Sequence, residues 1–392
     1  MSFLLRLALL GFTCASFVLT LYEVYIAHIF RTNVFLYYDY EQVLYNDPSS
    51  VHITFVVEGS QEAVRAIAAL KSILYFQGRI SDLENSCILE KTHLPEPICA
   101  GIQQPRHNFI SLHVIGNADV RSMFNAHLSM LKLRNFRWNF YRIENYLTKL
   151  NYIPSVYKQR PTDLLQLLLP EILPPEVVKT IVLQPEVLLN ENIAELWDHF
   201  DRFDKEQIYA GATDQTELEE CNLLRAIYDR KIHNGVLLMK LQVMRERNWS
   251  VLWRHAMQKL ILENPALPLT VTDILHTITV RNPTVLYRLS GEWNVQLSDQ
   301  NANGCRSVVW PNRRPDEPDC ITRPGEPSQP NRPNMAKLIT FPHHPDPTAE
   351  DCGKGMWANH SNVNRSLSSN ELKERYRSMY RIFKDLSLSC FH

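Results

Sequence analysis

Short apolar runs alternate with amphipathic segments from residue 51 to the end of the chain. Apolar runs that are rich in β-branched or aromatic residues indicate strands, and apolar residues that recur every three or four positions indicate helices. The predicted strands are 51–57, 109–115, 136–143, 180–183, 207–213, 235–240 and 284–289. The predicted helices are 60–76, 119–133, a short helix over 162–173 that Pro170 interrupts, one that begins at Asn192, 250–262, 270–280 and 370–386.

This order of strands and helices predicts the fold class. Strands that alternate with helices favour an α/β domain, here a doubly wound, mainly parallel sheet with helices on both faces. The run 180–183, "TIVL", is wholly apolar, as expected of a strand covered on both faces. Ligands of such sheets bind beyond the carboxyl ends of the strands. The residues that follow "TIVL" are Gln184, Pro185 and Glu186, so we expect a ligand site there.

Helix signals refine two of these boundaries. Asn192 precedes an apolar-periodic segment and Glu195 follows three residues later, which predicts a capping box. Ten prolines fall between Pro311 and Pro347, and the run 313–334 cannot be a helix or an inner strand. We therefore expect residues 311–350 to form a long loop.

The composition limits the classes of molecule that this chain is expected to bind. Of the 392 residues, 45% are hydrophobic and 21% are charged, which is ordinary for a globular protein with a substantial core. The formal net charge is −1, so nothing indicates a nucleic-acid partner.

The first residues differ from the rest. Leu7 to Tyr22 contains no charged residue and is shorter than the roughly 20 apolar residues of a full membrane span. It is interpreted as a signal-anchor, a cleaved signal peptide or a buried helix. The anchor gives a cytoplasmic tail, membrane segment and stem over 1–31 and a lumenal domain over 32–392.

Sequons and cysteines agree with a lumenal domain. Acceptor sequons for N-linked glycans begin at Asn248, Asn359 and Asn364. Eight cysteines occur, and their spacing fits no zinc module. In an oxidising compartment some of them should pair. The nearest local pairs are Cys87 with Cys99 and Cys305 with Cys320, and the alternative is that most are buried thiols.

Several motifs resemble one enzyme family. These are "IVL" followed by "VLLNENIAELWDHFDRF", "GEWNVQLSD" at 291–299, "VHITFVVEGS" with "LKSILYF", and "HNGVLLMKLQVMRERNWSVLWR" at 233–254. Together they are similar to glycosyltransferase family 8, and to the xylosyltransferase domain of LARGE-type xylosyl- and glucuronyltransferases. The resemblance runs in order from about residue 51 to 385. It implies a GT-A fold, a single-pass type II Golgi membrane protein, Mn²⁺, and retaining transfer of xylose, or of another hexose or pentose, from a UDP-sugar to a glycoprotein O-linked glycan.

The same resemblance identifies the metal positions, which this chain has changed. The family's Asp-x-Asp falls on Gln184 and Glu186, and its metal-binding histidine falls on Thr340. His343, or His344 beside it, would replace that histidine only through a shift of the loop. A divalent cation neutralises the charge that develops on the diphosphate, so these substitutions weaken the expectation of Mn²⁺.

The remaining positions of the site concern the substrate. The family's lysine falls on Gln166, and the last acid of its "DQD" motif falls on Asp273, the candidate catalytic residue. Its "FNTG" motif falls on 232–235, where Asn234 and Gly235 could approach a ribose or sugar hydroxyl. Several charged groups are lost from one place, so little metal-assisted sugar transfer is expected to remain. The motifs that belong to the scaffold are kept.

Three hypotheses follow from these positions. The chain is a divergent transferase that uses Glu186 and a histidine of the loop for its metal. Alternatively, it is a catalytically inactive pseudo-glycosyltransferase, a glycan-binding or scaffold subunit of an active partner transferase. The third hypothesis is an unrelated lumenal enzyme, for which no Gly-rich phosphate loop, G-x-S-x-G or H-E-x-x-H motif is found.

Overall fold

The structure is a computed structural model, and it describes residues 50–80, 87, 109–131, 133, 135–154, 157, 160–214, 230–263, 268–297, 300–301, 304–305, 336–341 and 369–391. From Val51 onward these residues belong to one compact unit, Val51–His392. The predicted membrane segment at 7–22 and the predicted loop at 311–350 lie mostly or wholly outside the described residues. None of the helices within the described ranges is long and apolar enough to span a membrane.

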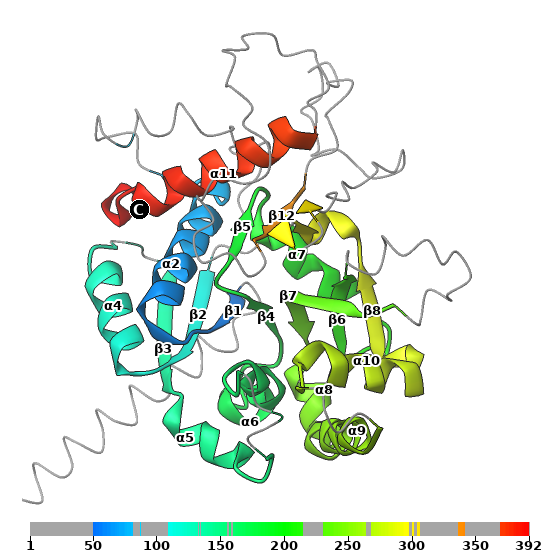
Figure 1. Cartoon of the computed structure of the whole chain (residues 1–392). Coiled ribbons are helices and arrows are strands. Elements are labelled where there is room, and N and C mark those ends of the chain that lie inside the picture. Colours follow the sequence, from blue (N-terminus) through cyan, green and yellow to red (C-terminus); the bar gives the residue numbers. More distant parts are fainter. Residues whose placement is uncertain are drawn as a thin grey trace, which may run out of the picture. The chain divides into compact units, whose positions relative to one another are not determined.

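A seven-stranded sheet forms the centre of the unit, with the strand order β3-β2-β1-β4-β7-β6-β8 (Figure 1). Its strands are β1 (Ser50–Val56), β2 (Phe109–Gly116), β3 (Phe136–Arg142), β4 (Thr180–Leu183), β6 (Tyr209–Thr213), β7 (Ile232–Met239) and β8 (Leu286–Leu289). All seven predicted strands are present, with ends that differ by at most three residues. The α/β fold class is therefore confirmed.

Strand direction explains where a site can form. β1 pairs with β4 in parallel, and β2 with β3 and β6 with β8 do the same. β7 runs antiparallel to both β4 and β6, with Leu183 opposite Val236. The start of β7 therefore lies at the edge where β1 and β4 end, which we call the carboxyl edge. β7 reverses an otherwise parallel sheet.

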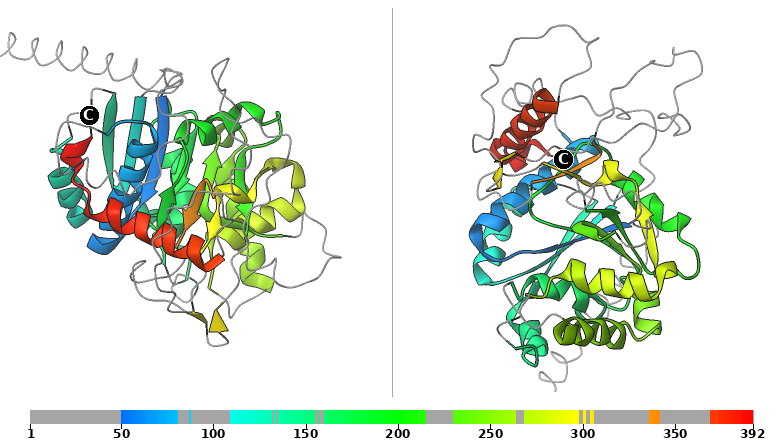
Figure 2. Two further views of the ribbon diagram at one scale, coloured as in Figure 1. Left: turned by 90° about the horizontal axis from the view of Figure 1, so that it is seen from above. Right: turned by 45° about the vertical axis from the view of Figure 1, so that its right-hand side comes forward.

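Helices cover both faces of this sheet, as predicted (Figure 2). On one face α2 (Gly59–Phe76) and α4 (Ala118–Leu128) pack against apolar residues of β1 and β2, such as Ile53 and Leu112. On the other face lie α9 (Trp249–Glu263) and α10 (Val271–Arg281), and Tyr209 of β6 donates a hydrogen bond to the backbone oxygen of Leu275. The remaining short helices are α5 (Glu144–Leu147), η1 (Thr148–Leu150), η3 (Asp163–Leu168), α6 (Leu169–Ile172), α7 (Ile193–Asp198), η4 (His199–Arg202), α8 (Leu241–Glu246), η7 (Pro283–Val285), η8 (Gly291–Trp293) and η9 (Leu388–Cys390).

Two predicted helix details need correction. The segment 162–173 is a 3-10 helix, η3, followed by the short α6, because Pro170 fits only the first turn of a new helix. Asn192 does cap α7 and accepts a hydrogen bond from Ala194, but the capping box is wrong. The backbone N–H of Asn192 donates to Glu191, and Glu195 instead pairs with Lys337.

The sequence pattern did not predict a small second sheet. Its order is β5-β12-β9, from Val187–Leu189, Leu338–Thr340 and Val295–Gln296. Strands of two or three residues are too short to show alternation, so they carry no periodic signal. Two further two-residue strands, β10 (Gln300–Asn301) and β11 (Gly304–Cys305), pair with each other. β12 is the middle strand of this sheet, so the prediction of a continuous loop over 311–350 is wrong at residues 338–340, a proline-free stretch that pairs on both sides. The sheet places Thr340 opposite Val187, close to the end of β4.

The last helix, α11 (Ser369–Asp385), packs across α2 through buried residues such as Tyr376 and Phe383. A disulfide bond joins Cys87 to Cys390, 303 residues apart. The predicted Cys87–Cys99 pair is therefore wrong, since chain proximity is no guide to pairing in a folded domain. Cys320 lies outside the described residues, so its predicted pairing with Cys305 stays a prediction.

Candidate functional site

Two segments of the candidate site meet at the carboxyl edge. The backbone N–H of Gln184, directly after β4, donates to the backbone oxygen of Gly235 on β7 at 3.0 Å. The backbone N–H of Phe341 donates to the backbone oxygen of Glu186 at 2.9 Å, which places β12 beside them. The structure thus brings together Gln184, Glu186, Gly235 and Thr340, as the sequence positions predicted.

A network of neutral groups surrounds Thr340. Its hydroxyl is buried and donates to Oδ1 of Asn294 at 2.5 Å. Nδ1 of His233 accepts from the backbone N–H of Gly235 at 3.0 Å and lies 3.1 Å from Nδ2 of Asn294. Because both neighbours of Nδ1 are donors, these contacts fit the neutral tautomer of His233 that carries its proton on Nε2. The network therefore supplies no charge at the position of the family's histidine.

Gly235 is required by this close packing. A Cβ atom at residue 235 would lie 2.6 Å from the Thr340 hydroxyl oxygen and 2.9 Å from Nδ1 of His233. Neither contact is tolerated in a folded protein without movement of the neighbours. The glycine thus serves the approach of β12 to β7, in addition to any role toward a ligand. Asn234 beside it is partly exposed.

Glu186 is held in an ion pair. Nη1 of Arg65, on α2, donates to Oε1 of Glu186 at 2.7 Å, and the two side chains are only 13% and 14% exposed. A charge-assisted hydrogen bond between largely buried groups is stronger than the exposed pairs of a protein surface. The last acidic residue at the family's metal position is therefore already neutralised by a protein cation.

A second set of polar contacts extends this cluster along α2. Arg160 donates to Glu62 and lies 3.5 Å from Asp163, and Thr162 donates to Glu58 at 2.6 Å. The backbone N–H of Glu58 donates in turn to Glu62. Residues 58, 62 and 65 are four and three positions apart, so they share one face of α2. Through these contacts the face of α2 is joined to the segment before η3 and to the segment after β4.

Burial affects the charge of this cluster. Burial raises the pKa of Glu62, and the nearby carboxylate of Glu186 adds to that rise. The hydrogen bond from Glu58 and the charge of Arg160 oppose it. The carboxylates of Glu62 and Glu186 are therefore close enough to repel each other.

The two other substrate positions have different surroundings. Gln166 is 4% exposed, and its buried Oε1 finds no hydrogen-bond partner among the described residues. Asp273 lies in the first turn of α10, where it accepts from Thr270 at 2.6 Å and pairs with Lys231 at 2.9 Å. Oδ2 of Asp273 thus stabilises the start of α10 and Oδ1 pairs with Lys231, and the catalytic role of Asp273 stays a prediction.

Of the remaining predicted site residues, only Asn248 lies within the described part of the chain. His343, His344, Asn359 and Asn364 lie outside the described residues. Asn248 is exposed, has a positive φ of 52°, and precedes α9. Asparagine tolerates this left-handed conformation better than most residues do.

Mn²⁺ does not fit the residues that the structure describes at this edge. Three or more oxygen or nitrogen ligands from the protein would normally surround such an ion. Within the described ranges no three His, Cys, Asp or Glu side chains gather in a way that could hold a metal. Gln184 is uncharged, the Glu186 carboxylate faces Arg65, and the Thr340 hydroxyl donates to Asn294. We therefore derive no chemical step through a metal.

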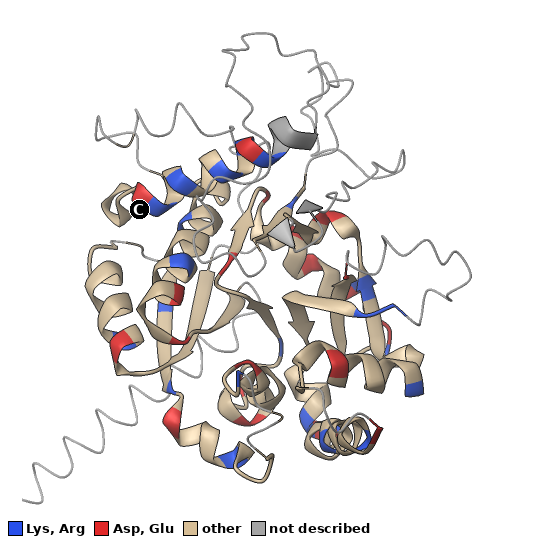
Figure 3. Cartoon of the chain, viewed as in Figure 1, with Lys and Arg blue, Asp and Glu red and all other residues tan. Residues whose placement is uncertain are grey.

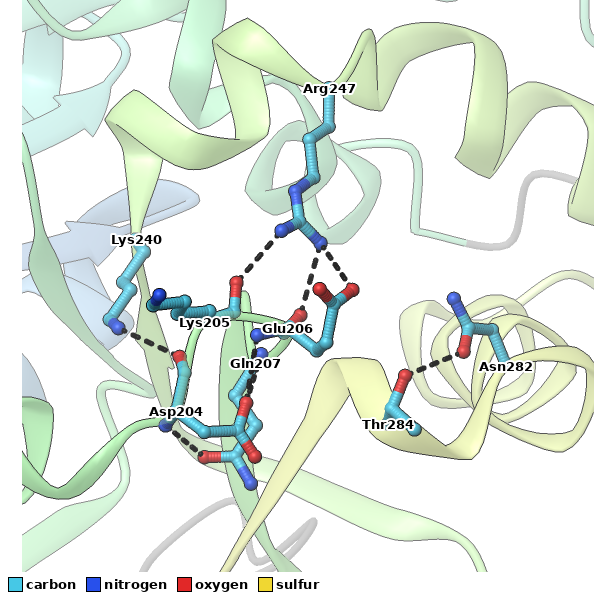
Figure 4. A network of polar contacts seen from close by, with 8 residues as sticks. All are labelled: Asp204, Lys205, Glu206, Gln207, Lys240, Arg247, Asn282 and Thr284. Carbon is cyan, nitrogen blue, oxygen red and sulfur yellow. Dashed lines mark hydrogen bonds and ion pairs between the residues drawn. The ribbon is translucent and has the colours of Figure 1, made fainter.

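The opposite edge of the sheet carries an unrelated polar network. Arg247 donates to the backbone oxygens of Lys205 and Glu206 and pairs with the Glu206 carboxylate at 3.2 Å (Figure 4). Asp204 accepts from the backbone N–H groups of Glu206 and Gln207, closing the turn before β6. These contacts satisfy the backbone polar groups of the turn at 204–207, and so their role is structural. Charged residues lie mainly on the helices and loops around the sheet (Figure 3).

The chain is similar in sequence to curated transferases. It is 29% identical over 208 residues to human xylosyl- and glucuronyltransferase LARGE2, a match that covers 52% of this chain and 29% of the human protein. It is 26% identical over 199 residues to human LARGE1, covering 50% of this chain and 26% of that protein. The chain is a diverged relative of the LARGE-type xylosyl- and glucuronyltransferases. It spans less than a third of the length of these two LARGE proteins. No family model matches the chain.

Solved glycosyltransferase structures are also similar to this LARGE-type relative. Mouse xyloside xylosyltransferase 1 aligns with a TM-score of 0.46 and 19% identity, covering 63% of this chain and 88% of that one. The galactosyltransferase LgtC aligns with a TM-score of 0.48 and 14% identity, covering 84% of this chain and 96% of that one.

The sequence reasoning missed the partners of the predicted residues. Arg65, Glu62 and Arg160 were not singled out, although the helical spacing of 58, 62 and 65 could have shown that they share a face. Asn294 lies inside the "WNVQLSD" motif and was taken only as part of that motif. No local signal connects it to Thr340, 46 residues away.

Proposed function

We propose that this LARGE-type relative is a pseudo-glycosyltransferase of the Golgi lumen. It binds a glycan and assists an active partner transferase, and it does not itself transfer xylose. The observation that carries the proposal is the Arg65–Glu186 pair, because it fills with protein charge the position from which the family would bind its metal. The neutral network at Thr340 supports the same conclusion.

The proposed location is a Golgi membrane with the 32–392 domain in the lumen. The Cys87–Cys390 disulfide supports an oxidising compartment, since such bonds are rare in the cytosol. The signal-anchor interpretation of 7–22 completes a single-pass type II arrangement. The proposed partners are a transferase and its glycoprotein glycan.

A second candidate is residual transfer from a UDP-sugar. The hydrogen bond from Gln184 to Gly235 favours it, because the strand ends that would face a donor remain joined. In that case Asn234 and Gly235 would lie along the sugar or ribose. The loss of metal ligands weighs against a fast reaction, since removing one preorganised charge-stabilising group costs about 2.7–4 kcal/mol of transition-state stabilisation.

The test is release of UDP from UDP-xylose, UDP-glucuronate and UDP-glucose by the purified protein, with and without Mn²⁺. A LARGE-type transferase serves as the positive control. We expect no UDP above the buffer rate for any donor. Metal-dependent UDP release that Glu186→Ala abolishes would overturn the proposal and establish the second candidate. Recovery of an active transferase with the intact protein from secretory cells is the complementary expected result.

A further inference from the structure

Strand β3 ends the central sheet, and its outer edge carries unpaired backbone groups. Among the described strands β3 pairs with β2 alone, in a continuous parallel register (Figure 1). The backbone N–H of Ile110 donates to the oxygen of Asn135, and the backbone N–H of Ile143 donates to the oxygen of Gly116. Residues 135 and 143 thus turn their backbone groups toward β2, and so does every second residue between them. The N–H and C=O groups of Phe136, Trp138, Phe140 and Arg142 therefore point away from the sheet, and within the described part of the chain no backbone group pairs with them.

This edge has few of the features that keep edge strands apart in monomeric proteins. Those features are short length, proline, bulges and charged side chains on the edge. β3 has seven residues, no proline and no bulge. Its central arginine, Arg137, donates to Ser111 of β2 and so lies over the sheet, and Arg142 stands at the last position. An edge of this kind pairs with another strand when one is available.

The apolar side chains around this edge are only partly covered. Trp138 stacks on Phe124 of α4 with ring centroids 6.2 Å apart, so α4 and the outward residues of β3 share one face of the sheet. Met130, just after α4, is 55% exposed. Most of the apolar residues that pack on the core while only partly buried lie in this region, namely Met123, Leu131, Leu133, Phe136, Trp138 and Phe140. A strand added to β3 would extend the sheet beside this surface.

A second copy of the chain complements the edge in one register. Antiparallel pairing about a two-fold axis at Asn139 places Trp138 opposite Phe140 of the second copy, and Arg142 opposite Phe136 of the second copy. Every outward residue of both strands then has a hydrogen-bonding partner, which no other centre allows.

The charges also fit this register. At the alternate positions Arg137 lies opposite Tyr141 of the second copy, and Asn139 lies opposite itself. No arginine of β3 therefore faces another arginine, and each faces an aromatic ring. Cross-strand pairs of this kind are favourable, whereas like charges directly opposite each other destabilise a sheet.

We infer that this protein forms a homodimer in which the two central sheets join through β3, antiparallel about a two-fold axis at Asn139. Such an interface limits itself, because each edge is used once by the same edge of the other copy. The inference does not depend on the proposed function, since it involves none of the residues of the candidate site.

The first experiment replaces Asn139 with Cys in the intact protein, expressed in secretory cells. In the inferred register residue 139 faces its own copy in a non-hydrogen-bonded pair, with Cβ atoms about 4.5–5.5 Å apart, close to the span of a disulfide. We expect Asn139→Cys to give a covalent dimer on a non-reducing gel, which a reducing agent separates. The matched control is Gln258→Cys, an exposed position on α9, which should give no more dimer than the wild type.

Two results of this experiment would overturn the inference. One is an equal yield of dimer from Asn139→Cys and Gln258→Cys, which would mean that the β3 edges do not meet. The other is a cross-link from Asn139→Cys to a protein of different mass in place of the dimer, which would mean that another chain occupies the edge.

The second experiment measures association of the intact protein by analytical ultracentrifugation. We expect a dimer for the wild type, and a monomer at about 10 μM would overturn the inference. Phe140→Lys places a charge at the centre of the edge and should raise the Kd of the dimer about tenfold or more. Phe140→Leu keeps an apolar side chain there and should change the Kd less than about threefold. Equal effects of the two variants would mean that β3 is not the interface. Asn139→Cys leaves the aromatic residues of β3 in place, so it tests the inference even where Phe140→Lys does not fold.

Discussion

The ion pair between Arg65 and Glu186 gives the sharpest prediction on stability. Replacing Arg65 with Met keeps an unbranched apolar stem and removes the charge of the side chain. The carboxylate of Glu186, 14% exposed, then loses the guanidinium group that lies 2.7 Å away. Breaking a fully buried pair costs about 3–5 kcal/mol, and exposed pairs contribute about 0–1 kcal/mol. A pair of intermediate burial should therefore contribute about 2 kcal/mol.

The assay is a double-mutant cycle with Arg65→Met, Glu186→Gln and the double variant, measured by thermal unfolding. Unfolding entropy is about 2.1 cal/mol/K per residue, so for the compact unit Val51–His392 a loss of about 2 kcal/mol lowers Tm by roughly 3 °C. The double variant should lose less than the sum of the single variants, because one removal already abolishes the contact.

A coupling energy below about 0.5 kcal/mol would refute the reasoning. It would mean that the two charges are effectively solvated and that the Glu186 carboxylate is available to a metal. The same protein samples, titrated with Mn²⁺, check this independently, since a bound ion raises Tm with its concentration. We expect no Mn²⁺-dependent rise in the wild type.

Four further results are expected. Gly235→Ala should cost about 1–3 kcal/mol of stability through overpacking, whereas Gly291→Ala, with no atom within 4 Å of the new Cβ, should be near neutral in the same thermal melt. Burial lowers the pKa of His199 to about 4, so as the pH falls the unfolded chain binds this proton before the folded protein does. The contribution of His199 to the free energy of unfolding should be fully present above pH 6.5 and fall by about 2 kcal/mol toward pH 4. His199→Phe should flatten that fall in thermal melts across this pH range. Cys390→Ser should cost about 2–5 kcal/mol, and reducing agent should then lower Tm no further unless another disulfide is present. Asn248 should carry an N-linked glycan in secretory cells, seen as a gel shift that endoglycosidase removes.

The strands and helices of the main sheet follow from sequence because each is long enough to show its period. Ile181, Val182 and Leu183 follow one another without a polar residue since both faces of β4 are covered, and α2 repeats apolar residues at helical spacing over 18 residues. By contrast, β5, β9 and β12 have two or three residues each and depend on tertiary pairing. Their pairing places Thr340 beside Val187, which no local pattern contains.

The candidate site shows the same division. The motif positions Gln184, Glu186 and Gly235 lie at one edge, because β7 runs antiparallel to β4 and begins where β4 ends. They could not show that Arg65 neutralises Glu186. That contact joins residues 121 positions apart and depends on the angle at which α2 crosses the sheet. The sequence thus identified candidate positions, and only the contacts between their side chains argue against a metal.

The Cys87–Cys390 bond has a consequence for how the protein is made. The ribosome must add 303 residues after Cys87 before its partner exists, so Cys87 waits as a thiol while the chain between them is synthesised. Cys99, Cys221, Cys305, Cys320 and Cys352 all appear before Cys390 and compete for Cys87. Correct oxidation therefore comes late and requires thiol–disulfide exchange to undo premature pairs. Biogenesis of this protein should depend strongly on a disulfide isomerase, and bacterial cytoplasm should be a poor host for its production.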